Sequence, residues 1–399
     1  MVCPLHFVTF VEVFAMQKLV LLYWGTILLM YLSQVYYPVE SEFRGLHCGR
    51  NHFIRKSSDL FMLLAIFWIC SFSFLRTAYN DTWGYAKNFR GAETAAAFIA
   101  KGGLKDITGN PFSSLYRNFL RQFTDNIHIY FFFPAFLSTY SVIKLCKKYS
   151  VNPAFSLLIF FSIGTYLLLM AALKQCFAFF FLSIALPYAI DKKYVRFFLL
   201  VFIAILFHTH AFMFAIIPFL FEKPWGKTTW LLFALVIFAM TTYDSTLGAF
   251  MQYAQSLGAN VYEGEVFDGH SINVLRVLVY WIPTVIALIF RRQLFSDSTR
   301  TENLFVNMTI VSSFILMIGL VQAANLFARM AGYFEIAMAI SLPWMIRKLF
   351  TKQSEKLITS CAVVLYFIYF WYENAINRGF EYDYAAITCW QFIRELIAR

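Results

Sequence analysis

The sequence predicts an all-α polytopic membrane protein, a single domain of residues 1–399 with about 10–12 transmembrane helices. Two observations support this class. Hydrophobic residues make up 60% of the chain and charged residues 14%, which lies outside the range of ordinary soluble domains. Apolar stretches of roughly 17–25 residues also recur from end to end, and each can cross about 30 Å of hydrocarbon as a helix with its backbone hydrogen bonds satisfied internally.

The individual spans are placed by apolar length and flanking charge. We expect helices at residues 18–37, 59–78, 127–145, 153–171, 174–190, 229–246, 274–290, 304–321, 329–346 and 357–372. Residues 194–221 form an apolar stretch too long for one plain span and short for two. His208, Thr209 and His210 interrupt it, so we expect a helical hairpin or re-entrant pair there.

Lysine and arginine predict the orientation, because short cytoplasmic loops collect them. More than half of the 33 such residues fall in the loops 38–58, 144–148, 191–196, 222–228, 291–302 and 347–356. All six loops lie on one side of the membrane if residues 194–221 cross it twice, or enter it and leave again on the same side. The net charge of +11 is then a topology signal, and nucleic-acid binding is not expected.

The opposite, outer side receives three longer segments, residues 79–126, 247–272 and 373–399. The first contains two amphipathic stretches, Ala95–Ile99 and Phe112–Phe123, which we expect to lie along the membrane surface. The second carries the acidic residues Glu263, Glu265 and Asp268. A solvated loop explains these acids better than a site for sugar hydroxyls or a divalent cation.

Four basic residues adjoin apolar runs on this outer side: Arg76, Lys174, Arg276 and Arg329. One or two such residues could be anchors that reach the lipid headgroups. The convergence of four on one face favours a site for an anionic headgroup, most simply a lipid-linked diphosphate, since a guanidinium matches phosphate oxygens.

Polar residues accompany two of these arginines at helical spacing. Asn273, Arg276 and Tyr280 lie at i, i+3 and i+7, and a second set, Asn325, Arg329 and Tyr333, lies at i, i+4 and i+8. Each set would form a polar stripe on one helix face that points toward protein. The alternative is an interhelical hydrogen-bond network, or pairing of Arg329 with Glu335.

Three residues are candidates for a catalytic base. Asp81 follows the second span among aromatic residues, where it could accept a proton or could be a helix cap or turn former. His208 and His210 flank the expected reversal, where they could orient or deprotonate a hydroxyl or could be structural.

The sequence shows no motif for a metal site, a disulfide framework or a nucleotide site. The seven cysteines are scattered without C-x-x-C spacing, so neither a metal site nor a disulfide framework is expected. The phosphate-binding pattern G-x-x-x-x-G-K-[ST] does not occur, which argues against ATP-driven transport by this chain alone.

Six short motifs occur in a characteristic order. They are F-L-R-x-x-x-x-D-x-x-x-Y from Phe74 to Tyr85, N-P-F-x-x-L from Asn110, K-Y-S at Lys148–Ser150, A-A-L-K-Q at Ala171–Gln175, A-I-L-F-H-T-H-A at Ala204–Ala211 and R-M-A-G-Y at Arg329–Tyr333. Their order and placement resemble the EpsG family, the Wzy-like polymerases of bacterial exopolysaccharide, capsule and O-antigen. The chain departs from the family at Lys174-Gln175, where Arg-Gln is usual, and lysine lacks the bidentate fork.

The resemblance implies a membrane glycosyltransferase of the GT-C-like class, in the bacterial inner membrane with its active site facing the exterior. Such an enzyme moves a glycan repeat from undecaprenyl diphosphate onto a second lipid-linked repeat, and needs neither nucleotide nor metal. Arg76, Lys174, Arg276 and Arg329 would then hold the diphosphate, with Asp81, His208 or His210 as base or acceptor orienter. The supporting residues would be Tyr85, Gln175, Asn273, Tyr280, Asn325 and Tyr333. Membrane lipids, a chain-length regulator and a flippase are the expected partners.

Two other classes of function compete with this one. A flippase or exporter of the same lipid-linked glycan would line cations through the membrane depth instead of confining them to one face. A membrane O-acyltransferase or ligase-like enzyme could use His208 or His210 as base, but its acyl donor arrives from the cytoplasmic side, where no comparable cluster occurs.

Overall fold

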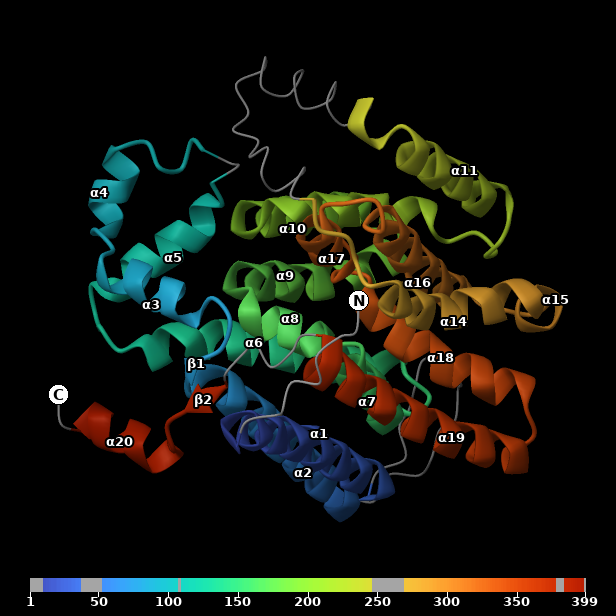
Figure 1. Cartoon of the computed structure of the whole chain (residues 1–399), viewed down its shortest axis with the longest axis horizontal. Helices are drawn as coiled ribbons and strands as arrows, with labels where there is room; N and C mark the ends of the chain where they lie inside the picture. Colours follow the sequence, from blue (N-terminus) through green and yellow to red (C-terminus); the bar gives the residue numbers. More distant parts are fainter. Residues whose placement is uncertain (1–9, 37–51, 107–108, 246–268, 378–383, 398–399) are drawn as a thin grey trace, which may run out of the picture.

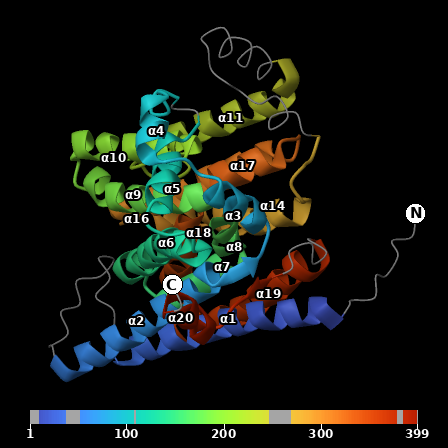
Figure 2. The same ribbon diagram turned by 90° about the vertical axis from the view of Figure 1, so that its left-hand side faces the viewer.

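In a computed structural model, residues 10–36, 52–106, 109–245, 269–377 and 384–397 are described, and they are almost entirely helical (Figure 1). At one edge, α1 and α2 run side by side with α19 next to them, as both views show (Figures 1 and 2). Their bounds are α1 Phe10–Tyr36, α2 His52–Phe74 and α19 Lys352–Trp371. The acidic loop residues Glu263, Glu265 and Asp268 lie outside the described residues.

The centre of the molecule is built from helices that are buried along most of their length. They are α6 Ile127–Tyr149, α7 Pro153–Ser162, α8 Thr165–Ala171, α9 Leu173–Ile190, α16 Arg300–Ile318 and α18 Glu335–Leu349. The span expected at 153–171 is broken, since α7 and α8 meet at 62°. Gly164 supplies the left-handed backbone of this break, with φ of 82°, a conformation that glycine adopts without steric cost.

The apolar stretch 194–221 contains two short helices that pack against each other. They are α10 Tyr194–Phe207 and the 3₁₀ helix η1 Thr209–Phe219, with His208 at the break between them. Beyond η1, α11 (Lys227–Thr241) lies at the end of the molecule opposite α1 and α2 (Figure 2).

The span expected at 329–346 does not begin at Arg329. The structure has a short helix, α17 (Ala324–Ala331), and then a turn through Gly332 and Phe334 before α18. Arg329 therefore lies in the last turn of α17. Upstream of α16 are α14 (Val274–Ile289) and α15 (Arg291–Leu294).

The segment after α2 and the C-terminal tail meet in a two-stranded sheet. After α2 the backbone leaves the helix, so that Arg76 begins a strand and does not end the second helix as expected. This strand, β1 (Arg76–Ala78), pairs antiparallel with β2 (Ala385–Ala386) from the tail. The remaining elements here are α3 Thr82–Arg90, α4 Ala95–Ala100, α5 Pro111–Arg121, the π-helical turn η2 Tyr372–Asn377 and α20 Cys389–Ile397.

The described ranges contain four helices long and apolar enough to cross a membrane, or five if α7 and α8 form one bent span. Six shorter apolar helices of 10–17 residues accompany them. The all-α polytopic class is thus confirmed. Among the spans expected from hydropathy, the one at 153–171 is broken between α7 and α8, and the 194–221 stretch is divided between α10 and η1.

Candidate functional site

A cavity of about 390 Å³ lies where α8, α14, α17 and η2 meet the connection between α2 and α3. Its lining residues are Tyr79, Asn80, Leu167, Leu168, Ala171, Ser271, Ile272, Asn273, Arg276, Ala324, Asn325, Ala328 and Glu373. Three of these, Asn273, Arg276 and Asn325, are residues that the sequence pattern predicted for the site. A volume of this size can hold a headgroup or a sugar unit, whereas a single water needs only about 30 Å³.

Arg276 enters the cavity from the first turn of α14. The Asn273 side chain caps this helix by accepting from the Leu275 amide at 2.8 Å. The segment before the helix is fixed by a backbone bond from Ile272 to the Gly319 carbonyl, 2.8 Å. The Arg276 Nε is buried and has no hydrogen-bond partner in the described part of the chain. A buried donor without an acceptor is costly, so an anionic ligand in the cavity would supply what the protein does not.

The first predicted stripe is present as a continuous helix face. Tyr280 lies one turn beyond Arg276, buried, with the guanidinium carbon 5.9 Å from its ring centroid. Its hydroxyl donates to the Ile163 carbonyl at the α7–α8 break, 2.9 Å. Tyr280 thus joins α14 to the break that precedes α8, and Leu167, Leu168 and Ala171 of α8 line the cavity.

The second stripe does not lie on one helix. Asn325 and Arg329 are in α17, but the helix ends at Ala331, and Tyr333 follows in the turn. The Tyr333 hydroxyl instead lies 2.6 Å from Nδ1 of His208. At this helix end Gly332 packs closely, since a Cβ added there would lie 2.8 Å from the Gln175 Nε2.

A second polar group surrounds His208. The His210 ring lies 4.8 Å away, and Arg329 and Lys174 are within electrostatic range of His208. The side chains of this group do not line the cavity, although Arg329 directly follows the lining residue Ala328. The structure therefore places Lys174, His208, His210 and Arg329 together, beside α17.

Gln175 connects the start of α9 to the end of α17. Its Nε2 donates to the Arg329 carbonyl at 2.9 Å. Because Lys174 precedes Gln175, this bond also fixes the lysine backbone next to the arginine. Lys174 thus keeps a cation in this group.

Helix α5 is attached to the break between α10 and η1. The Asn110 Oδ1 accepts from both the Thr209 amide, at 2.9 Å, and the Thr209 hydroxyl, at 3.2 Å. The Ser113 hydroxyl donates to the Phe207 carbonyl at 2.7 Å. The start of α5 therefore covers the His208 reversal, a contact that its amphipathic pattern did not predict.

Arg76 does not join the other cations. Its side chain is fully buried, donates to the Ser73 carbonyl and to the Thr82 hydroxyl, and lies with its guanidinium carbon 4.2 Å from the Phe131 ring centroid. Burial lowers the pKa of Arg76 from its ordinary value. The expectation that all four cations open into one cavity is not met here, because protein groups surround this guanidinium.

Asp81 is exposed at the N-cap position of α3, makes no side-chain cap hydrogen bond and is not a lining residue. Its neighbour Asn80 lines the cavity in a left-handed conformation, with φ of 43°. Tyr85 lies one turn along α3, where burial and then the Asp81 carboxylate raise its pKa to about 12. Its phenol stays protonated at neutral pH and can act as a hydrogen-bond donor.

Two buried glutamates near Arg276 were missed as site residues. Glu373 lines the cavity, and Glu335 accepts a hydrogen bond from the Thr165 hydroxyl. Both are within electrostatic range of Arg276, and one of them, Glu335, is the acid that the sequence offers as a partner of Arg329. Glu373 follows the apolar helix α19, and adjacency to an apolar run is the same signal that singled out the basic residues.

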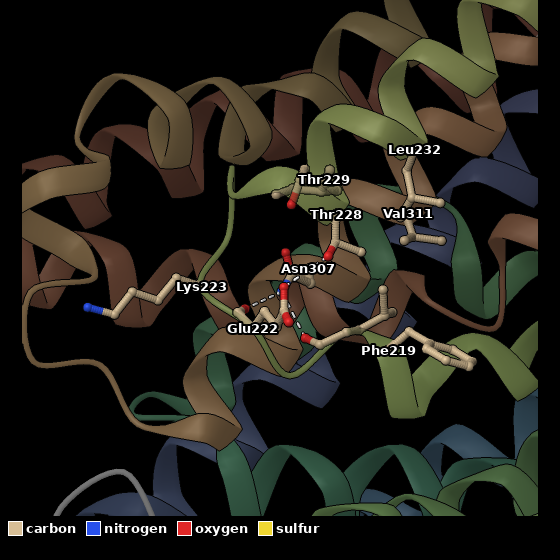
Figure 3. Close-up of a pocket in the computed structure, with 10 residues that line it drawn as sticks. Phe219, Glu222, Lys223, Thr228, Thr229, Leu232, Asn307 and Val311 are labelled. Atoms are coloured by element: carbon tan, nitrogen blue, oxygen red, sulfur yellow. Dashed lines mark hydrogen bonds between the residues drawn. The ribbon is translucent and has the colours of Figure 1, made fainter.

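A separate pocket of about 10 Å³ lies between η1, α11 and α16 (Figure 3). Asn307 fills it by donating to the Leu220 and Glu222 carbonyls, at 2.8 and 2.7 Å, while Lys223 points away. The Thr228 hydroxyl also donates to the Glu222 carboxylate. This pocket is too small for a ligand, and its hydrogen bonds hold the 222–228 loop.

Comparison with known proteins bears on the same region. A family model described as EpsG family matches residues 59–385. The chain belongs to the EpsG family. No curated protein and no solved structure matches it. As an EpsG-family member it is a multi-pass membrane protein of polysaccharide biosynthesis, and the match spans every residue of the cavity and of the His208 group.

Proposed function

We propose that this EpsG-family protein is a polysaccharide polymerase of the Wzy type. It transfers a glycan repeat from undecaprenyl diphosphate onto another lipid-linked repeat at the outer face of the bacterial inner membrane. The observation that carries the proposal is Arg276, whose buried Nε lacks a partner at the wall of a 390 Å³ cavity. Family membership supports the polymer-forming class of reaction.

The reaction places two demands on the protein. The donor's anomeric carbon carries a diphosphate leaving group, so negative charge must be stabilised as the carbon–oxygen bond breaks. Arg276 in the cavity, with Arg329 and Lys174 beside α17, provides cations for that charge. Because the leaving group is on the lipid, no nucleotide donor is required. Direct attack by the acceptor hydroxyl inverts the anomeric configuration.

The second demand is removal of the acceptor proton. His208, held at Nδ1 by Tyr333, keeps Nε2 for such a role, and His210 lies next to it. Asp81 is exposed and outside the lining, which favours the turn-forming role for it. In this proposal His208 and His210 lie beside Arg329 and serve as base or acceptor orienter.

A flippase for the same lipid-linked glycan is the second candidate function. It predicts cations distributed through the membrane depth. The polar residues described here gather instead near the β1–β2 side of the bundle, at the connection between α2 and α3. That arrangement favours a reaction at one face over passage across the membrane.

The test is reaction of the purified protein with lipid-linked repeat units in detergent or liposomes. Polymerase activity gives a ladder of products without ATP. Arg276→Ala and Arg329→Ala should each lower the rate by about 10- to 100-fold, since each removes charge-assisted bonds to the leaving group. Arg291→Ala is the matched control, because Arg291 is the exposed first residue of α15, beyond the end of α14 that lies away from Arg276. Transbilayer movement without a ladder would replace the polymerase with the flippase.

A further inference from the structure

Glu373 is the one carboxylate among the described residues that line the cavity. It is 2% exposed, which is unusual for a glutamate, since acidic side chains are almost never fully buried unless they are paired. Arg276 lines the same cavity and interacts electrostatically with Glu373. The cavity therefore presents a carboxylate and a guanidinium to the same space.

The local backbone holds Glu373 in this place. It lies in η2, where the α-helical pattern of α19 widens into a π-helical turn over residues Tyr372–Asn377. Such turns are rare and are found frequently at functional sites. The Asn374 side chain donates to the Phe370 carbonyl at 2.8 Å, which closes the turn on α19.

A second contact sets the turn against α14. The Asn273 Nδ2 donates to the Tyr372 hydroxyl at 3.4 Å. Asn273 is also the cap of the helix that carries Arg276. One asparagine thus fixes both the segment that bears the cation and the segment that bears the carboxylate.

We propose that Glu373 is the general base that deprotonates the acceptor sugar hydroxyl. The assignment rests on the polymerase function proposed above. As the acceptor oxygen forms its bond to the donor's anomeric carbon, its proton moves to the Glu373 carboxylate. The bond from that carbon to the diphosphate oxygen breaks, and undecaprenyl diphosphate leaves with the electron pair, its charge met by Arg276. The proton passes to water after the product moves.

This position suits a base better than the alternatives do. Asp81 is exposed and does not line the cavity, and neither do His208 and His210. A base and a cation for the leaving group must flank one reacting carbon, and Glu373 and Arg276 share a cavity large enough to admit it. The competing explanation is that Glu373 only neutralises Arg276.

The test compares Glu373→Gln with Glu373→Asp in the full-length protein. Two quantities are measured: the rate of ladder formation from lipid-linked repeats, and the affinity for undecaprenyl diphosphate as the probe. A base predicts that Glu373→Gln lowers the rate by about 100-fold or more while the affinity changes little, and that Glu373→Asp keeps part of the activity. Glu93→Gln, an exposed carboxylate of the outer segment, is the matched control.

Chemical rescue separates a base from a structural carboxylate. Formate added to Glu373→Ala should restore part of the rate, since it supplies a carboxylate in the space left by the side chain. The inference is overturned if Glu373→Gln retains activity within a few-fold, if it loses rate and affinity together, or if none of these variants folds. If the wild-type protein forms no ladder, the proposed polymerase function is wrong. If wild type and Glu373→Gln both form a ladder, only the assignment of Glu373 as the base is wrong.

Discussion

Two buried arginines illustrate how a residue's surroundings separate structure from function. Arg76 is satisfied by the Ser73 carbonyl, the Thr82 hydroxyl and the Phe131 ring. Arg276 leaves its Nε without a partner in the described ranges, beside a cavity. Leaving a buried donor unsatisfied costs about 1–3 kcal/mol. The sequence marks both arginines alike, because adjacency to an apolar run does not reveal which neighbours fold back onto the guanidinium.

Gly332 provides a residue-level test of how Arg329 is presented. A Cβ at this position would lie 2.8 Å from the Gln175 Nε2 and 2.9 Å from the Leu168 Cδ2. We expect Gly332→Ala to displace Gln175 from the Arg329 carbonyl, to lower stability by about 1–3 kcal/mol and to reduce the polymerisation rate. Thermal unfolding in detergent and the ladder assay measure the two effects.

Gly84 is the matched control for Gly332, because nothing lies within 4 Å of a Cβ added there. It is inside α3, where alanine is a better helix former than glycine by about 1 kcal/mol. Gly84→Ala should therefore leave stability unchanged or raise it. Equal behaviour of the two variants would show that the contact between Gln175 and α17 does not position Arg329.

At the scale of elements, the attachment of α5 to the hairpin is testable through Asn110. Only the Oδ1 of this residue accepts the two bonds from Thr209. Asn110→Ala should loosen the reversal at His208, cost about 1–3 kcal/mol of stability and slow polymerisation several-fold. Asn110→Asp keeps an acceptor oxygen at the same place and tolerates the left-handed φ of 57°.

The contrast between the two substitutions is the informative measurement. The ladder rate and thermal stability of Asn110→Asp should stay close to wild type, while both fall in Asn110→Ala. Thr94→Ala removes the cap of α4 in the same outer segment, with its bond to the Ala97 amide, and should leave the rate unchanged. If Asn110→Ala behaves like Thr94→Ala, α5 does not support the hairpin tip.

Hydropathy and charge in the sequence predicted the helical class and the positions of most helices, because a run of apolar residues has one stable form in a bilayer. They did not predict the breaks at Gly164 and Gly332. Hydropathy encodes neither the left-handed backbone at Gly164 nor the packing of the Gln175 side chain against Gly332. The helical spacing of polar residues in the sequence predicted part of the site, namely Asn273 and Arg276. Glu373 did not, since its burial arises from η2 folding back toward α14.

The orientation of the whole molecule is the last point that a measurement can decide. The tail strand β2 pairs with β1, so Cys389, which begins α20 three residues beyond β2, must lie on the same side as the connection that lines the cavity. Its thiol is exposed. If the basic loops are cytoplasmic, a charged maleimide that cannot cross membranes should label Cys389 in intact spheroplasts, and Cys389→Ser should remove that label.

Ser296→Cys in a background with all seven native cysteines replaced by serine is the matched probe for the other side, since Ser296 is exposed in the turn that follows Arg291 and Arg292. It should be labelled only after permeabilisation. The reverse result would turn the cavity toward the cytoplasm. Lipid-linked repeats would then have to react before export, and the reaction proposed for Arg276 and Glu373 would need a donor on the inner leaflet. One pair of thiols therefore decides on which side of the membrane the cavity opens.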